Sequence, residues 1–119
     1  MPNSANFTGM GAATRQALGG TAAKGLAGAG STQATATKLG ADHNQFSTVG
    51  AGQGALLPAP NTGEWISVHN GGANALSVYT NVGGAINGGS ANTAVSVPAG
   101  KAAIFIPIDA LTWIAVISA

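Results

Sequence analysis

The side chains that could carry acid, base or metal chemistry are few in this sequence and widely spaced. Its only carboxylates are Asp42, Glu64 and Asp109, and its only imidazoles are His43 and His69. Catalysis by two carboxylates requires that they meet in one pocket. Because each carboxylate lies beside a different expected turn or strand end, we expect no such pair and no enzyme activity.

Metal and cofactor motifs are missing as well. No His-x-x-x-His pair is present, and the adjacent residues Asp42 and His43 point apart on an extended chain. The chain contains no Gly-x-Ser-x-Gly elbow and no cysteine. The glycine-rich run 50–54 is not followed by a helix that could bind a phosphate. We therefore expect no catalytic, metal or cofactor site, with His43 in a hydrogen-bonded turn and His69 facing solvent.

The charge content is very low for a chain of 119 residues, with four Lys and Arg, three Asp and Glu, and a formal net charge of +1. Nucleic-acid binding usually needs clustered basic residues, and here the basic residues are scattered. The longest apolar stretch, 102–117, is interrupted and too short for a membrane span of about 20 residues. Little charge also means little self-repulsion, which favours association. We expect one unit that assembles with protein partners, without nucleic acid or membrane.

Alternation of apolar and polar residues predicts an all-β fold. The runs 65–69 and 76–79 alternate, and the glycine and asparagine residues at 70–74 predict a hairpin turn between them. We expect a first strand from Ser31 and further strands at 45–49, 55–57, 85–86, 93–97, 101–106 and 111–118. Short strands separated by turn residues every 8 to 12 positions or so are typical of a sandwich or small barrel. The sequence therefore predicts an antiparallel β-sandwich or jelly-roll-like domain over residues 31–119.

Residues 1–30 are predicted to form an extended arm rich in Gly and Ala. No period of two or of about 3.6 is sustained in this range. Its large apolar residues include Phe7, Met10, Leu18 and Leu26, whereas a disordered tail would usually carry more charge. We expect these four residues to anchor the arm on a neighbouring subunit; a plain disordered tail is the alternative.

The two final strands are apolar on both faces. Ile104 alternates with Phe105 on the first, and Trp113 alternates with Ile114 on the second. In a sandwich one face of a strand normally meets water. We expect one face to pack the core and the other to be covered by a second subunit or by the arm; the alternative is that loops of the same chain hide it.

Large aromatic and apolar residues define the candidate interface. Trp and Tyr are enriched at protein interfaces, and we predict an assembly interface formed by Phe7, Met10, Leu18, Leu26, Trp65, Tyr79, Phe105 and Trp113. Trp65, Tyr79 and Trp113 could instead form a platform on which a sugar stacks. Exposure of these aromatic residues in a groove would favour carbohydrate binding, and burial between subunits would favour assembly.

A family resemblance is carried by five segments, namely 31–39 (STQATATKL), 57–58 (LP), 68–79 (VHNGGANALSVY), 84–88 (GAING) and 97–101 (VPAGK). In these segments, which lie within residues 31–119, the chain resembles small virion accessory proteins of tailed bacteriophages. The resemblance implies a non-enzymatic virion component, commonly a trimer, that decorates the head or forms part of a fibre. It supplies no functional residues.

These observations together predict a capsid decoration (cement) or head-fibre protein that stabilises or adorns a phage shell through protein contacts. The expected partners are the major capsid protein or another virion protein, and further copies of the chain in a homotrimer. The expected location is the virion, assembled in the cytoplasm of a bacterial host. The alternative is a tail-fibre or tail-associated module that recognises carbohydrate on the host surface.

Overall fold

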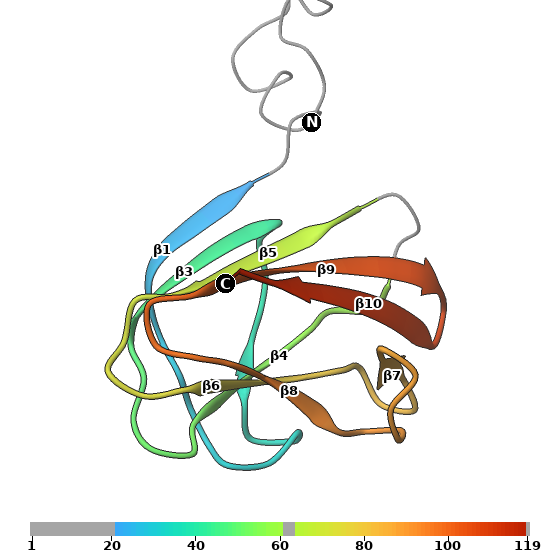
Figure 1. Cartoon of the computed structure of the whole chain (residues 1–119), viewed down its shortest axis with the longest axis horizontal. Coiled ribbons are helices and arrows are strands. Elements are labelled where there is room, and N and C mark those ends of the chain that lie inside the picture. Colours follow the sequence, from blue (N-terminus) through green and yellow to red (C-terminus); the bar gives the residue numbers. More distant parts are fainter. Residues whose placement is uncertain (1–20, 61–63, 119) are drawn as a thin grey trace, which may run out of the picture.

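The computed structural model describes residues 21–60 and 64–118, which form two β-sheets (Figure 1). One sheet has six strands in the order β1-β3-β5-β9-β10-β7, and the other has four in the order β2-β4-β6-β8. The strands of the described residues are β1 (Ala22–Ala27), β2 (Thr37–Lys38), β3 (His43–Thr48), β4 (Gly54–Leu56), β5 (Ile66–Asn70), β6 (Leu76–Tyr79), β7 (Ala85–Ile86), β8 (Ala94–Val97), β9 (Ala102–Asp109) and β10 (Thr112–Ile117). This part of the chain contains no helix, and hence none that could span a bilayer. The predicted all-β class is confirmed.

The first six strands alternate between the two sheets. β1, β3 and β5 are parallel neighbours in the six-stranded sheet, and β2, β4 and β6 are parallel neighbours in the four-stranded sheet. The chain therefore passes from one sheet to the other and back in three coils, and successive coils begin about 22 residues apart. The arrangement is solenoid-like, and Figure 1 shows β3 and β5 in one layer with β4 and β6 in the other.

The predicted hairpin at 65–79 is wrong, because β5 and β6 lie in different sheets. The segment between them is an arch that carries the chain across the core. Buried Asn70 holds this arch: its Nδ2 donates to the carbonyl oxygens of Asn74 at 2.8 Å and Val97 at 2.9 Å, and its Oδ1 accepts from the backbone N–H of Gly72 at 3.0 Å. The glycine and asparagine residues that predicted a tight turn therefore form a wider connection.

Antiparallel pairing between strands is found in the second half of the chain, and the first half has one isolated antiparallel bridge among its described residues, between Ala29 and Gly54. β8 is antiparallel to β6, β9 to β5, and β10 to β9, whereas β7 is parallel to β10. The three coils return to each sheet in the same direction, so their strands can pair only in parallel. Both sheets are mixed, and the prediction of an antiparallel architecture is wrong for β1 to β6.

The first described strand begins earlier than predicted. β1 lies within the range 1–30 that was expected to be an arm, and it pairs with β3, whereas residues 31–36 form bends and turns. The predicted arm therefore includes a strand of the domain. Gly25 has a φ of +73°, and the register shifts between Ala23 and Leu26. Such a bulge interrupts the period of two by which a strand is recognised in sequence.

The core lies between the two sheets and draws on both. The six-stranded sheet contributes Phe46, Ile66, Val68, Ile86, Ala103, Phe105 and Trp113, and the four-stranded sheet contributes Ala55, Leu76, Val78 and Val97. The alternation predicted for residues 65–69 is confirmed, since Ile66 and Val68 are buried while His69 is exposed. Periodicity thus identified the buried face of β5 correctly, although its partner strand did not follow from the sequence.

Gly54 in β4 permits a close approach between strands. A Cβ atom at this position would lie 2.7 Å from the carbonyl oxygen of Ser77 and 2.8 Å from Cε2 of Tyr79. We expect Gly54→Ala to lower the free energy of unfolding by about 1–3 kcal/mol through overpacking, measured by urea denaturation. Gly40→Ala is the control, because no atom lies within 4 Å of a Cβ atom built there. Equal unfolding midpoints for the two variants would contradict this packing.

Candidate functional site

Three of the predicted interface residues, Phe7, Met10 and Leu18, lie outside the described residues, and their role as anchors stays a prediction. Leu26 is described and lies on β1, where it is partly buried against the core of its own chain. Leu26 therefore contributes to the β-domain, contrary to its predicted place on an arm that contacts a neighbour.

Phe105 and Trp113 lie in the core rather than at an interface. Phe105 is 0% exposed and Trp113 is 1% exposed. The indole Nε1 of Trp113 donates to Oδ1 of Asn81 at 2.9 Å, so the only polar group of this buried side chain has a partner. The two final strands do have two apolar faces, as predicted, but the aromatic residues occupy the inner one.

The three aromatic residues considered for sugar stacking do not share an exposed surface. Trp65, which immediately precedes β5, is 55% exposed. Tyr79 is partly buried on β6, and its hydroxyl donates to the carbonyl oxygen of Ser31 at 3.0 Å. Because Trp113 is buried, Trp65 would have to bind a sugar without the other two.

An exposed apolar surface lies on the outer face of β9 and β10. We call it the outer patch and define it by six residues, Trp65, Ile104, Ile106, Ile108, Ile114 and Val116. Ile106 is partly buried, and the other five are exposed, up to 57% for Val116. On β9 these residues alternate with buried Ala103, Phe105 and Pro107. The outer patch is thus the face of the sheet opposite to the core.

Strand register makes the outer patch continuous. Across β9 and β10, Ile114 is paired with Ile106, and Val116 is paired with Ile104. On the other side of β9, extending its register with β5 by one residue places Trp65 level with Ile106. Side chains on neighbouring strands at paired positions are in contact range, about 4.5–5.5 Å between Cβ atoms. The six residues therefore form one surface across three adjacent chain segments.

Polar residues cover the adjoining part of the same sheet. Ser67 and His69 point outward from β5, and Gln45 and Ser47 point outward from β3. Of the residues of β5, β9 and β10, only Asp109 is Asp, Glu, Lys or Arg, and it is exposed at the end of β9 next to Ile108. The six residues of the outer patch are therefore uncharged, while polar side chains border the patch on β5 and exposed carboxylates follow Ile108 (Asp109) and precede Trp65 (Glu64).

The outer patch has the size of a functional apolar patch. Counting about half of roughly 200 Å² for each of its exposed side chains gives on the order of 500 Å², which lies within the range of about 300–600 Å² for the largest apolar patch of a monomer, and that patch is often functional. Full burial of a large apolar side chain contributes about 1.5–3 kcal/mol, so covering five half-exposed ones would contribute about 4–8 kcal/mol per chain. Since these residues are exposed, loops within residues 21–60 and 64–118 do not hide this face, contrary to that alternative.

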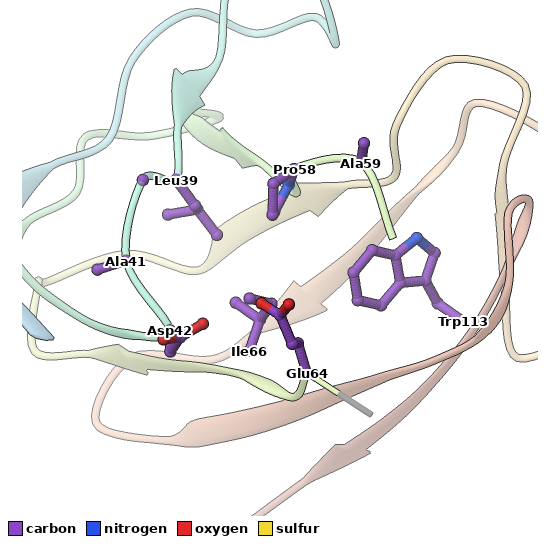
Figure 2. Close-up of a pocket in the computed structure, with 9 residues that line it drawn as sticks. Leu39, Ala41, Asp42, Pro58, Ala59, Glu64, Ile66 and Trp113 are labelled. Carbon is purple, nitrogen blue, oxygen red and sulfur yellow. The ribbon is translucent and has the colours of Figure 1, made fainter. Parts of the chain in front are cut away.

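Two carboxylates do meet at a pocket, contrary to expectation. Asp42 and Glu64 line an open pocket of about 200 Å³, together with apolar walls that include Leu39, Pro58 and Trp113. Figure 2 shows both carboxylates on one side of the pocket, with the indole of Trp113 beside them. Sequence spacing could not reveal this, because the two residues are brought together by successive coils.

The pocket lacks further groups for catalysis or metal binding. One carboxylate oxygen of Asp42 accepts a hydrogen bond from the backbone N–H of Thr21 at 3.0 Å. The other described lining side chains are aliphatic, proline or indole and supply no nucleophile. No group of three or more His, Asp or Glu that could hold a metal occurs among residues 21–60 and 64–118. Two carboxylates alone do not define a reaction.

The remaining titratable residues have structural surroundings. His43 begins β3, rather than lying in a turn as predicted, and its Nδ1 is 2.8 Å from Oγ of Ser67. The pKa of Asp109 is lowered, chiefly because its carboxylate accepts a hydrogen bond from the backbone N–H of Leu111, with a further contribution from the Thr112 hydroxyl. This carboxylate closes the turn between β9 and β10.

Comparison with known proteins adds no relative: no family model matches the chain, and no curated protein or solved structure matches it either. The outer patch is therefore the candidate functional site. Alternation in the sequence indicates two apolar faces on β9 and β10, but not which of them is exposed. The pairing of β9 with β5 decides this, because Ser67 and His69 are polar and share the outer face with Ile104.

Proposed function

We propose that this chain is a structural protein of a bacteriophage virion, a β-sandwich domain that decorates the capsid or forms part of a head fibre through protein contacts. The outer patch carries this proposal. It is an uncharged apolar sheet face on a chain with very few charges, and burial of such a face against another protein is favourable. The phage assignment itself rests on the sequence resemblance, and the major capsid protein is the proposed partner on the shell.

Burial of the outer patch by residues 1–20 of the same chain would be opposed by the loss of backbone entropy in those residues. Their large apolar side chains, Phe7, Met10 and Leu18, would contribute about 1.5–3 kcal/mol each if fully buried. Fixing the backbone costs about 1–2 kcal/mol for every residue that becomes ordered. The sheet face of a folded partner is already ordered, so its binding does not require this loss of backbone entropy. A folded partner is therefore favoured over residues 1–20.

Carbohydrate recognition on a tail fibre is less well supported. Of the aromatic residues proposed for stacking, Trp113 is buried and the Tyr79 hydroxyl is bonded to its own chain. Trp65 is exposed but adjoins the aliphatic outer patch instead of a polar groove. Binding of sugars needs hydrogen-bonding groups beside the ring, and the residue level with Trp65 on β9 is the aliphatic Ile106.

Immunogold electron microscopy of purified phage particles tests the proposed function. Particles from the phage that encodes this chain should carry gold on the head when labelled with an antibody against the chain. Particles of the same phage with the gene interrupted are the control, and they should stay unlabelled. Absence of the chain from intact particles, checked by mass spectrometry of the same preparation, would contradict the proposal. Label confined to the tail would favour the tail-fibre alternative.

A further inference from the structure

The outer patch is an interaction surface, and its chemistry restricts what can cover it. We propose that the outer patch binds the outer patch of further copies of this chain, so that homo-oligomers form face to face through β9 and β10. This inference rests on the proposed structural function and specifies one of its partners.

Electrostatics favours a second copy as the partner. The six residues of the outer patch carry no formal charge, and the only Asp, Glu, Lys or Arg of β5, β9 and β10 is Asp109 at the end of β9. Two such faces can meet without like-charge repulsion and without removing an ion from water. A partner that recognised its target through charge would find no ionised group on this face. A second copy presents the same uncharged apolar surface, so self-association requires no charged group on either partner.

The shape and rigidity of the patch also suit contact between two sheets. Ile104, Ile106, Ile114 and Val116 are β-branched, and their χ1 angles are already restricted before contact. Sheets pack face to face about 10 Å apart by interdigitating such side chains. Trp65 adds an exposed aromatic side chain at the margin, the kind of residue that most often dominates binding energy.

The area of the patch is compatible with such an interface. On the order of 500 Å² of exposed apolar surface is more than half of the roughly 800 Å² that each partner buries in an interface of standard size. The polar side chains of Ser67 and His69 on β5 lie beside it, where a polar rim is normally found. The patch and this border together can supply the full contact.

Ile114→Lys in the full-length chain tests the inference through the mass of the protein in solution. Sedimentation equilibrium of the wild type should give twice the chain mass of 11.4 kDa, because one patch that packs on its own copy closes as a dimer. The lysine should raise the dissociation constant at least about 30-fold, because it places a charge at the centre of the contact. Ser96→Lys is the matched control: it adds the same charge at an exposed position of β8 in the other sheet and should leave the mass unchanged. A wild type that stays monomeric at millimolar concentration would overturn the inference.

Photo-crosslinking directly identifies the residues that contact the outer patch. It does not depend on whether the lysine variant folds. The photoreactive residue p-benzoylphenylalanine is introduced in place of Val116, the most exposed residue of the patch, in a mixture of ¹⁴N- and ¹⁵N-labelled chains. We expect crosslinks that join differently labelled chains at outer-patch residues. Crosslinks confined to residues 1–20 of the same chain would overturn the inference.

The same crosslink on intact particles separates this inference from the proposed function. If the chain is present on virions but position 116 crosslinks only to a different virion protein, the structural function stands and the homotypic contact is refuted. If chains crosslink to one another at the patch while particles lack the protein, the homotypic contact stands and the virion assignment is refuted.

Discussion

Replacing Trp113 with alanine should lower the free energy of unfolding by about 3–5 kcal/mol, the usual cost of removing a buried aromatic side chain. The indole is 1% exposed in the core between the two sheets, and its loss also leaves Oδ1 of Asn81 without its 2.9 Å donor. The thermal midpoint should fall by roughly 10–25 °C for a domain of this size. Differential scanning calorimetry and chemical denaturation measure the two quantities.

Trp65→Ala is the matched control for this experiment, because it removes the same side chain from an exposed position. At a dilution at which the chain is monomeric, its effect on stability should stay within about 0.5 kcal/mol, the usual range for surface substitutions. The pair of variants also decides between core and interface for Trp113. If Trp113→Ala retained the wild-type midpoint and altered only self-association, Trp113 would be an interface residue, as the sequence had predicted.

Replacing Asn70 with alanine should cost about 2–4 kcal/mol of stability. Its side chain donates to the carbonyl oxygens of Asn74 and Val97 and accepts from the N–H of Gly72, and a buried polar group left unpaired costs about 1–3 kcal/mol. Urea denaturation measures the loss, and hydrogen exchange should show faster exchange at Gly72 before global unfolding. The effect should be local because these bonds hold the arch between β5 and β6.

His69→Ala, at the adjacent exposed position of the same strand, is the control for Asn70→Ala. It changes strand composition without removing any bond of the arch, so its midpoint should match that of the wild type. Identical midpoints for the Asn70 and His69 variants would mean that the amide of Asn70 does not hold the arch.

Local patterns in the sequence predicted most strands but not their partners. The apolar and polar faces of β5 and β9 follow from alternation of residues, and proline and glycine limit β4 and β8. Which strands pair depends on contacts far apart in sequence, such as β9 with β5, and no local signal contains them. Glycine-rich connections were interpreted as hairpin turns because a turn and an arch use the same residues. Deleting residues 1–30, the predicted arm, would remove β1 from the six-stranded sheet.

At the candidate site, too, local sequence predicted part of the structure and long-range packing determined the rest. Alternation in the sequence predicted that β9 and β10 have two apolar faces. Phe105 and Trp113 were predicted to lie on the interface face, but they lie on the face that packs in the core. Large side chains favour both interfaces and cores, so residue type could not decide. Only the arrangement of two sheets around Phe105 and Trp113 shows that the isoleucine and valine face is free for a partner.

The parallel stacking of coils has a consequence for how proteins of this shape can change in length. A coil makes its principal contacts with the coil before it and the coil after it, so one coil inserted or removed in evolution alters the height of the stack by about one strand spacing, roughly 4.8 Å. β9 and β10 pair with the last coil through β5. Insertion between β1 and β3 would therefore lengthen the domain while leaving the surface of β9 and β10 unchanged. A longer domain of this kind could span a larger distance between neighbouring proteins in an assembly while it keeps the same binding surface on β9 and β10.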